Sequence, residues 1–154
     1  MSKPLFLSIV AMALLTLGGC AGRDHAGTDA GLHPQGGSET GTAWQGDRST
    51  ATERSEQTAR TAEEWDRLWA QAGVAAPAAL PDGLMAVGLF LGPRTGTGYA
   101  VSLDPATGAG EAVVVPYHET VPGPDDPVTD QATSPFAIRL IKAQPQPVRF
   151  VLAP

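Results

Sequence analysis

Leu84-Met85-Ala86-Val87-Gly88-Leu89-Phe90-Leu91 is a continuous apolar run near the middle of the chain, and Gly92 and Pro93 follow it directly. A short apolar run that ends at turn-forming residues is typical of a β-strand. The chain beyond this run continues in the same way, with segments that alternate apolar and polar residues or are rich in β-branched residues. These further predicted strands are 99–103, 111–117, 136–142 and 148–152.

Glycine and proline punctuate the connections between the predicted strands. They are concentrated at 92–98, at 104–110 and at 144–147. Such residues favour tight turns, and connections this short favour strands that lie beside each other and run antiparallel.

A single helix is predicted before the strands. Thr61 and Glu64 have the spacing of a capping box, in which each side chain bonds a free backbone N–H of the first turn. Apolar residues follow at helical spacing, and Gly73 stands where the helix would end. These apolar residues are Trp65, Leu68, Trp69 and Ala72. Two tryptophans on one face would also suit a ligand platform, but this spacing is more typical of a face that packs on a core.

These elements together predict the fold class. One helix at 61–72 and five or more strands, without a repeating strand-helix-strand pattern, indicate an α+β domain. We expect one N-terminal amphipathic helix packed on a mainly antiparallel β-sheet, or on a partly closed barrel, of five to seven strands.

The N-terminus has the order of a secretory signal. Lys3 precedes an apolar segment at 5–15, and small residues follow it. Leu17-Gly18-Gly19-Cys20 resembles a bacterial lipobox, in which the cysteine thiol receives a diacylglyceryl group. A transmembrane anchor would need about 20 apolar residues, which is more than this run contains. We therefore expect a signal peptide at 1–19 and lipidation of Cys20. The protein would then be anchored in an envelope membrane by its lipid, facing the periplasm or the cell surface.

The chain after the signal peptide divides into a tether and one domain. Residues 20–41 are rich in glycine and small polar residues, and such a composition buries too little apolar surface to become ordered. His25 and His33 lie in this tether without partners at fixed spacing, so we expect them to be solvated and not to bind metal. Residues 42–154 then form a single domain.

Charge and cysteine content exclude several classes of function. The chain has 10 Lys and Arg residues against 16 Asp and Glu residues, a net charge of −6, and no basic cluster. This balance argues against binding to nucleic acid. Cys20 is the only cysteine, so an acylated chain has no thiol left for a disulfide, a metal site or a nucleophile.

The sequence also lacks a recognisable set of catalytic or calcium-binding residues. His118 with Ser102 or Ser134 would need an accompanying Gly-x-Ser-x-Gly motif, which the sequence lacks. Asp125 and Asp126 lack further oxygen ligands at calcium-binding spacing. The sequence therefore predicts no enzyme activity, no catalytic residue, no metal and no cofactor.

Several segments resemble one known family. These segments are Trp65–Trp69, the apolar strand ending at Gly92, Arg94–Tyr99, the valine-rich stretch 112–115 and Gln131–Phe136. In this order they resemble the C-terminal domain of the protease complex subunit PrcB family, and the similarity extends from about residue 43 to residue 152. The resemblance implies a lipoprotein module that associates with a surface protease as its protein partner and supports it without catalysing a reaction itself.

Two loops contain the candidate binding residues. Arg94, Thr95, Gly96, Gly98 and Tyr99 combine a forked cation, exposed backbone and an aromatic anchor of the kind enriched at interfaces. A plain glycine-rich turn would explain the same residues.

The second candidate loop contains Thr133, Ser134, Pro135 and Phe136. The Thr-Gly-aromatic and Pro-aromatic pattern of the two loops also resembles chagasin-like inhibitors of cysteine proteases. That resemblance implies an alternative function, in which the Arg94–Tyr99 and Thr133–Phe136 loops enter a protease cleft.

Overall fold

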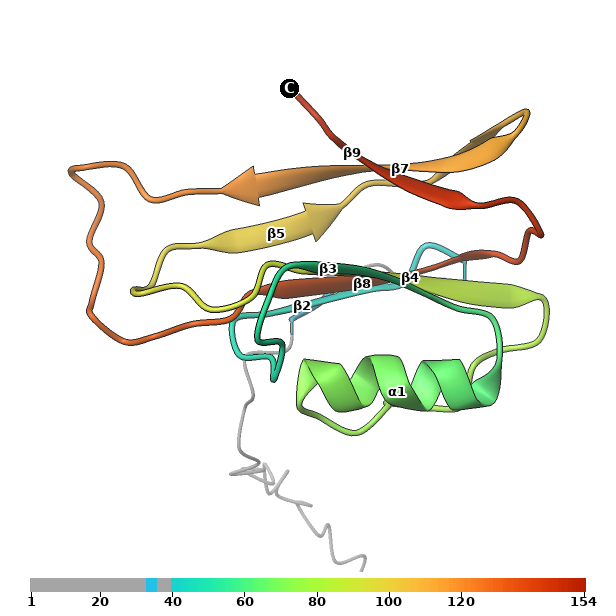
Figure 1. The fold of residues 1–154 in the computed structure, drawn as a ribbon, viewed down its shortest axis with the longest axis horizontal. Coiled ribbons are helices and arrows are strands. Elements are labelled where there is room, and N and C mark those ends of the chain that lie inside the picture. Colours follow the sequence, from blue (N-terminus) through green and yellow to red (C-terminus); the bar gives the residue numbers. More distant parts are fainter. Residues whose placement is uncertain (1–32, 36–39) are drawn as a thin grey trace, which may run out of the picture.

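Two β-sheets and one helix make up the fold (Figure 1). The computed structural model describes residues 33–35 and 40–154. The first sheet has the strand order β1-β2-β8-β4-β3, and all neighbouring strands in it are antiparallel. Its strands are β1 (His33–Gln35), β2 (Ala43–Gly46), β3 (Ser55–Ala59), β4 (Leu84–Phe90) and β8 (Phe136–Lys142).

The second sheet is built around the long strand β7 (Ala112–Thr120). Two short strands, β5 (Ala100–Leu103) and β6 (Thr107–Ala109), pair antiparallel with successive parts of β7. On the other edge of β7, β9 (Val148–Leu152) pairs parallel with residues 113–117.

Helix α1 (Ala62–Ala72) forms where the sequence predicts it. Thr61 Oγ1 accepts a hydrogen bond from the Glu64 N–H at 3.2 Å, and the Glu64 carboxylate accepts one from the Thr61 N–H at 3.1 Å. Hydrogen bonds from the backbone N–H groups of Arg60 and Thr61 hold the pKa of Glu64 below its ordinary value. Gly73 ends the helix with φ 79°, a conformation that glycine adopts without strain.

The first sheet is the middle of three layers, with α1 against one face and the second sheet against the other (Figure 1). Strand β4 shows this most clearly. Ala86 and Phe90 belong to the apolar cluster on the helix side, whereas Met85, Val87 and Leu89 belong to the cluster between the sheets. Both faces of β4 are therefore buried, and this explains why its sequence is continuously apolar.

The helix-side core contains all three tryptophans of the chain. Trp65 and Trp69 are 2% and 1% exposed, and Trp44 from β2 packs against both. The ring centroids are 5.3 to 6.0 Å apart in edge-to-face arrangements. Trp65 Nε1 also donates to the Ala78 carbonyl at 2.8 Å. The prediction that the apolar helix face packs on a core is confirmed.

The predicted fold class is wrong. The described residues form a mainly β fold with two sheets and one short helix, and not an α+β domain with one sheet or a partly closed barrel. The error lies in the connections, because 92–98 and 144–147 each lead the chain from the first sheet to the second. Turn-forming residues show where the chain bends, but they do not specify the strand beside which it continues.

The N-terminal predictions fall largely outside the described residues. The signal peptide at 1–19, Cys20 and most of the tether at 20–41 lie there. Within the tether, β1 pairs with residues 43–45 of β2. In the part of the chain that the structure describes, no helix combines the length and the apolar character needed to cross a membrane.

Candidate functional site

The structure brings the two predicted binding loops together. Arg94 and Thr133 form an isolated antiparallel bridge, with the Arg94 N–H 2.7 Å from the Thr133 oxygen and the Thr133 N–H 3.0 Å from the Arg94 oxygen. Thr133 Oγ1 also donates to the Gly96 carbonyl at 2.8 Å. These bonds join the two loops to each other, so the paired loops form one structural unit between the end of β4 and the start of β8.

The second loop is part of the interior. Thr133, Ser134 and Phe136 are 6%, 8% and 1% exposed, and Pro135 is buried as well. The Ser134 N–H donates to the Asp47 carbonyl at 2.7 Å, and the Ser134 carbonyl accepts from the Ser49 N–H at 2.9 Å. Backbone bonds therefore fix this loop where it leads into β8, and its buried side chains do not form a recognition surface.

An exposed surface lies next to these paired loops. We call it the loop end and define it as residues 95–99 and 121–130. Its largest exposed apolar side chains are Val121 and Val128, which are 62% and 52% exposed. Neither valine is among the binding residues that the sequence predicts. Their signal, an apolar residue within a proline-rich and acidic loop, is too common to stand out.

The two glycines of the first loop allow the loop end to pack closely. A Cβ at Gly98, whose φ is 90°, would lie 2.9 Å from the Pro122 Cβ. A Cβ at Gly96 would lie 2.9 Å from the Thr129 carbonyl oxygen. Thr97 and Thr129 then bond across the contact, with the Thr129 N–H 2.9 Å from Thr97 Oγ1. Close approach, and not ligand binding, is thus a sufficient reason for these glycines.

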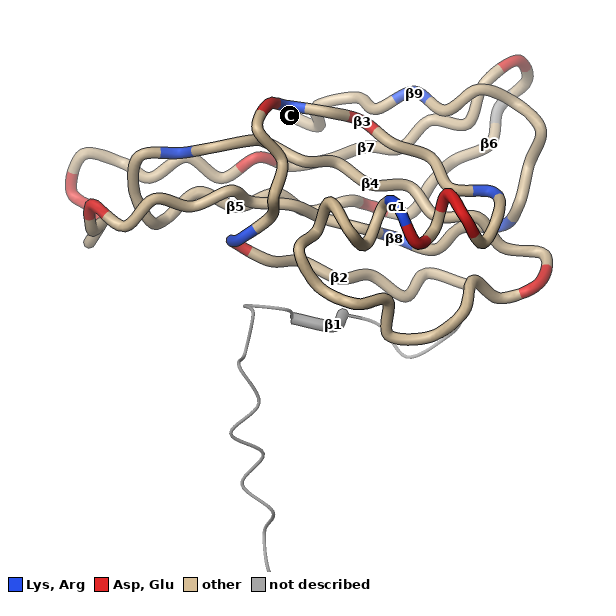
Figure 2. The backbone as a smooth tube through the Cα atoms, turned by 60° about the horizontal axis from the view of Figure 1, so that its bottom comes forward, with Lys and Arg blue, Asp and Glu red and all other residues tan. Residues whose placement is uncertain are grey.

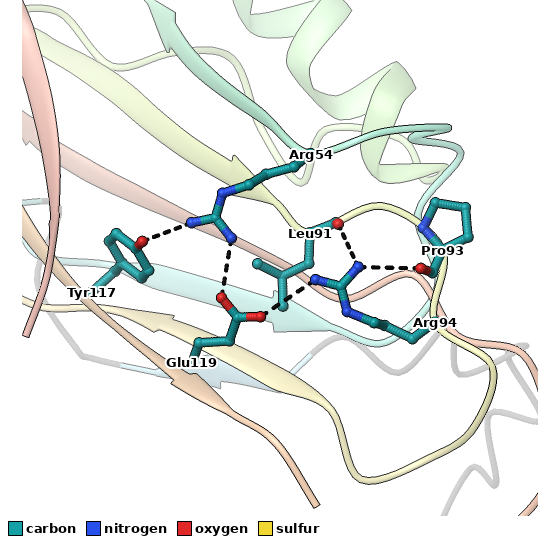
Figure 3. A network of polar contacts seen from close by, with 6 residues as sticks. All are labelled: Arg54, Leu91, Pro93, Arg94, Tyr117 and Glu119. Atoms are coloured by element: carbon teal, nitrogen blue, oxygen red, sulfur yellow. Dashed lines mark hydrogen bonds and ion pairs between the residues drawn. The ribbon is translucent and has the colours of Figure 1, made fainter.

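Arg94 points into a polar network that joins the two sheets (Figure 3). Its guanidinium donates to the backbone carbonyls of Leu91 at 2.8 Å and Pro93 at 3.1 Å, and to the Glu119 carboxylate at 3.3 Å. The guanidinium also lies 5.8 Å from the Tyr99 ring centroid. Most of the donors that the sequence assigns to a partner are therefore occupied within the protein.

Arg54 reaches the same network from the start of β3. It donates to Glu119 at 3.0 Å and to the Tyr117 hydroxyl at 2.7 Å (Figure 3). The sequence prediction omits Arg54, Tyr117 and Glu119. Tyr117 and Glu119 are two residues apart on one strand, so they share a face of it. The sequence prediction misses this pair because it ends the strand at residue 117, whereas β7 extends to Thr120.

Residues 85–141 match a family model described as PrcB C-terminal. We call these matched residues the PrcB segment. The predicted family resemblance is thereby confirmed for this part of the interval 43–152. No curated protein and no solved structure matches the chain.

The PrcB segment extends from β4 to β8 and contains both candidate loops and the loop end. It supplies Arg94, Tyr117 and Glu119 to the polar network, whereas Arg54 comes from outside it. The segment thus builds the contact between the sheets, and the N-terminal part of the domain completes it.

The PrcB segment also contains a serine on β5, a histidine on the neighbouring strand β7 and an aspartate directly after β5. Ser102 pairs with His118 in the register, and His118 Nε2 lies 3.0 Å from Asp104 Oδ2. Among the described residues, however, Ser102 makes no hydrogen bond to His118. Nucleophilic catalysis would need that bond to activate the hydroxyl.

No group of three or more histidine, cysteine or acidic side chains in the described ranges is arranged to hold a metal ion.

Proposed function

We propose that this chain is a lipid-anchored, non-enzymatic binding module of the cell envelope that assists a protease complex. The observation that carries the proposal is the match of residues 85–141 to the PrcB C-terminal family, whose name refers to a protease complex subunit. The Leu17–Cys20 pattern supports the lipid anchor.

The geometry of the PrcB segment favours binding through the loop end. Thr133 and Ser134 are buried, and Arg94 and Glu119 bond each other. These side chains therefore have structural partners. Exposed valines such as Val128, by contrast, offer apolar contact area at the same end of the molecule.

The inhibitor alternative receives less support from the geometry. A wedge that enters a protease cleft needs exposed loop side chains, whereas the side chains of residues 133–136 are buried. Insertion of this loop into a cleft would require it to leave the core. We therefore retain a single functional proposal.

Co-purification tests the proposed partner. The acylated full-length protein is isolated from its native envelope in mild detergent, and the co-purifying proteins are identified by mass spectrometry. We expect a protease to co-purify with the wild-type protein. Much less of it should co-purify with Val128→Asp, because a carboxylate buried in the contact with the protease weakens an apolar interface. Leu152→Asp is the matched control, since Leu152 is an exposed apolar residue on β9.

Two results would contradict this proposal. Wild type that retains no protease argues against the protease link. If wild type and Val128→Asp retain the protease equally, the loop end does not form the contact with it.

The anchor has a separate test. Cys20→Ser removes the thiol that would receive lipid, so we expect the protein to leave the detergent-soluble membrane fraction and to lack the lipid mass on its N-terminus. Mass spectrometry of the mature N-terminus provides the measurement. A wild-type protein without lipid mass, which partitions as the variant does, would disprove lipidation.

A further inference from the structure

Strand β3 has an open outer edge. It pairs with β4 on one side, and no described strand lies on its other side. The hydrogen bonds between β8 and the residues before β2 determine which backbone groups of β3 face outward. Leu140 of β8 accepts from the Gly41 N–H at 3.0 Å and donates to the Thr42 carbonyl at 2.9 Å. The backbone groups of Leu140 therefore point away from β4, and those of its neighbours Arg139 and Ile141 point toward it.

The antiparallel register carries this alternation across β4 to β3. Gln57 and Ala59 direct their backbone groups toward β4. The N–H and C=O groups of Glu56 and Thr58 consequently face the open edge. In the described ranges no other backbone group bonds to them. A peptide that lies beside β3 would find four main-chain partners in these two residues.

A polar groove runs between β3 and α1. Two adjoining hollows of about 400 and 580 Å³ share Gln57 and Gln71 in their linings. The side-chain amides of these two residues hydrogen-bond each other, and Gln71 Nε2 donates to Ser55 Oγ at 2.8 Å. A strand added to β3 would point alternate side chains toward this groove, whose amides and hydroxyls can both donate and accept.

Acidic residues lie on β3 and just before it (Figure 2). Glu53 and Glu56 are exposed, and neither forms an ion pair within the described residues. The arginines on either side of β3 are engaged elsewhere. Arg54 pairs with Glu119, and Arg60 donates to backbone carbonyls of the β8–β9 connection. The two carboxylates are therefore available to a cation on a partner.

We propose that the open edge of β3 binds an extended peptide segment of a partner protein that carries a lysine or an arginine. The peptide adds a strand to the first sheet through the backbone groups of Glu56 and Thr58, and its cation pairs with Glu56 or Glu53. Addition of a second copy of β3 is disfavoured, because it would bring these carboxylates close to their counterparts. This site goes beyond the proposed function, since it requires neither the lipid nor a protease.

The test uses the purified full-length chain and a labelled seven-residue peptide, Thr-Val-Thr-Lys-Thr-Val-Thr, followed by fluorescence anisotropy. We expect saturable binding that weakens by about ten-fold when glutamate replaces the lysine, because an attraction becomes a repulsion. Two further peptides carry N-methyl groups on alternate amides, one on the odd and one on the even positions. One of the two should not bind, because its methyl groups replace the N–H groups that face β3. Hydrogen exchange should show new protection at the amides of Glu56 and Thr58 but little change at Gln57, whose amide already faces β4.

Two variants and a control separate charge from backbone pairing. Glu56→Lys should weaken binding of the lysine peptide by about ten-fold. Thr58→Pro removes an outward N–H, which an edge strand tolerates, and should also weaken binding. Glu111→Lys makes the same charge change at the β6–β7 turn and should leave binding unaltered.

Any of several outcomes would overturn the proposal. These are the absence of saturable binding, binding without protection of the Glu56 and Thr58 amides, and equal weakening by Glu111→Lys. Self-association of the chain that protects the same two amides without peptide would identify a second copy as the occupant instead.

Discussion

Glu119 connects the two sheets because a single carboxylate receives two guanidinium groups. Arg94 approaches it at 3.3 Å from the connection that follows β4, and Arg54 approaches at 3.0 Å from the residue before β3. The Glu119 side chain is 22% exposed, so solvent screens these pairs less than it screens pairs on an open surface. In sequence Arg94 resembles a free binding group, but in the fold its role is largely structural.

Replacement of Glu119 should therefore affect stability. Glu119→Ala is expected to lower the free energy of unfolding by about 1–3 kcal/mol, since both guanidinium groups lose a charged acceptor. His118→Ala is the matched control. His118 is next to Glu119 in the chain, and the change removes its exposed pair with Asp104. We expect the free energy of unfolding to change by no more than about 0.5 kcal/mol. Urea denaturation measures both, and equal effects would show that the network contributes nothing particular.

Elements differ in how far their own residues define them. Helix α1 begins at the Thr61–Glu64 capping box and ends at Gly73, and all these signals lie within the helix or next to it. Strand β4 is also recognisable as an apolar run. Its central position, however, depends on β3 and β8 at its edges and on separate apolar layers against its two faces. The same holds for β9, whose parallel pairing with β7 nothing in its own sequence indicates.

At the scale of the whole molecule, the middle sheet couples the outer layers. Strands β4 and β8 contribute side chains to the helix-side core and to the core between the sheets. Loss of either core would expose one face of both strands. We therefore expect the described domain to unfold as a single cooperative unit.

The position of the tryptophans makes this expectation measurable. All three lie on the helix side, whereas Val113 is fully buried between the sheets. Val113→Ala should lower the free energy of unfolding by about 2 kcal/mol through lost burial and a cavity. The denaturation midpoint from tryptophan fluorescence should fall together with that from far-ultraviolet circular dichroism. A fluorescence midpoint that stays at the wild-type value would mean that the layers unfold independently.

The sequence by itself determined the helix with its caps, the approximate positions of β4, β5, β7, β8 and β9, the family resemblance that residues 85–141 bear out, and the burial of the apolar helix face in a core. It did not locate β6, which lies in a segment that its glycine and proline content assigns to a turn. Capping and hydrophobic periodicity act between residues a few positions apart, so they can be read along the chain. Only the tertiary structure decided that there are two sheets, that residues 133–136 are buried, that Arg94 is bound to Glu119 and that the edge of β3 is open. Each of these depends on contacts between residues far apart in the chain, and local pattern does not encode which distant segments meet.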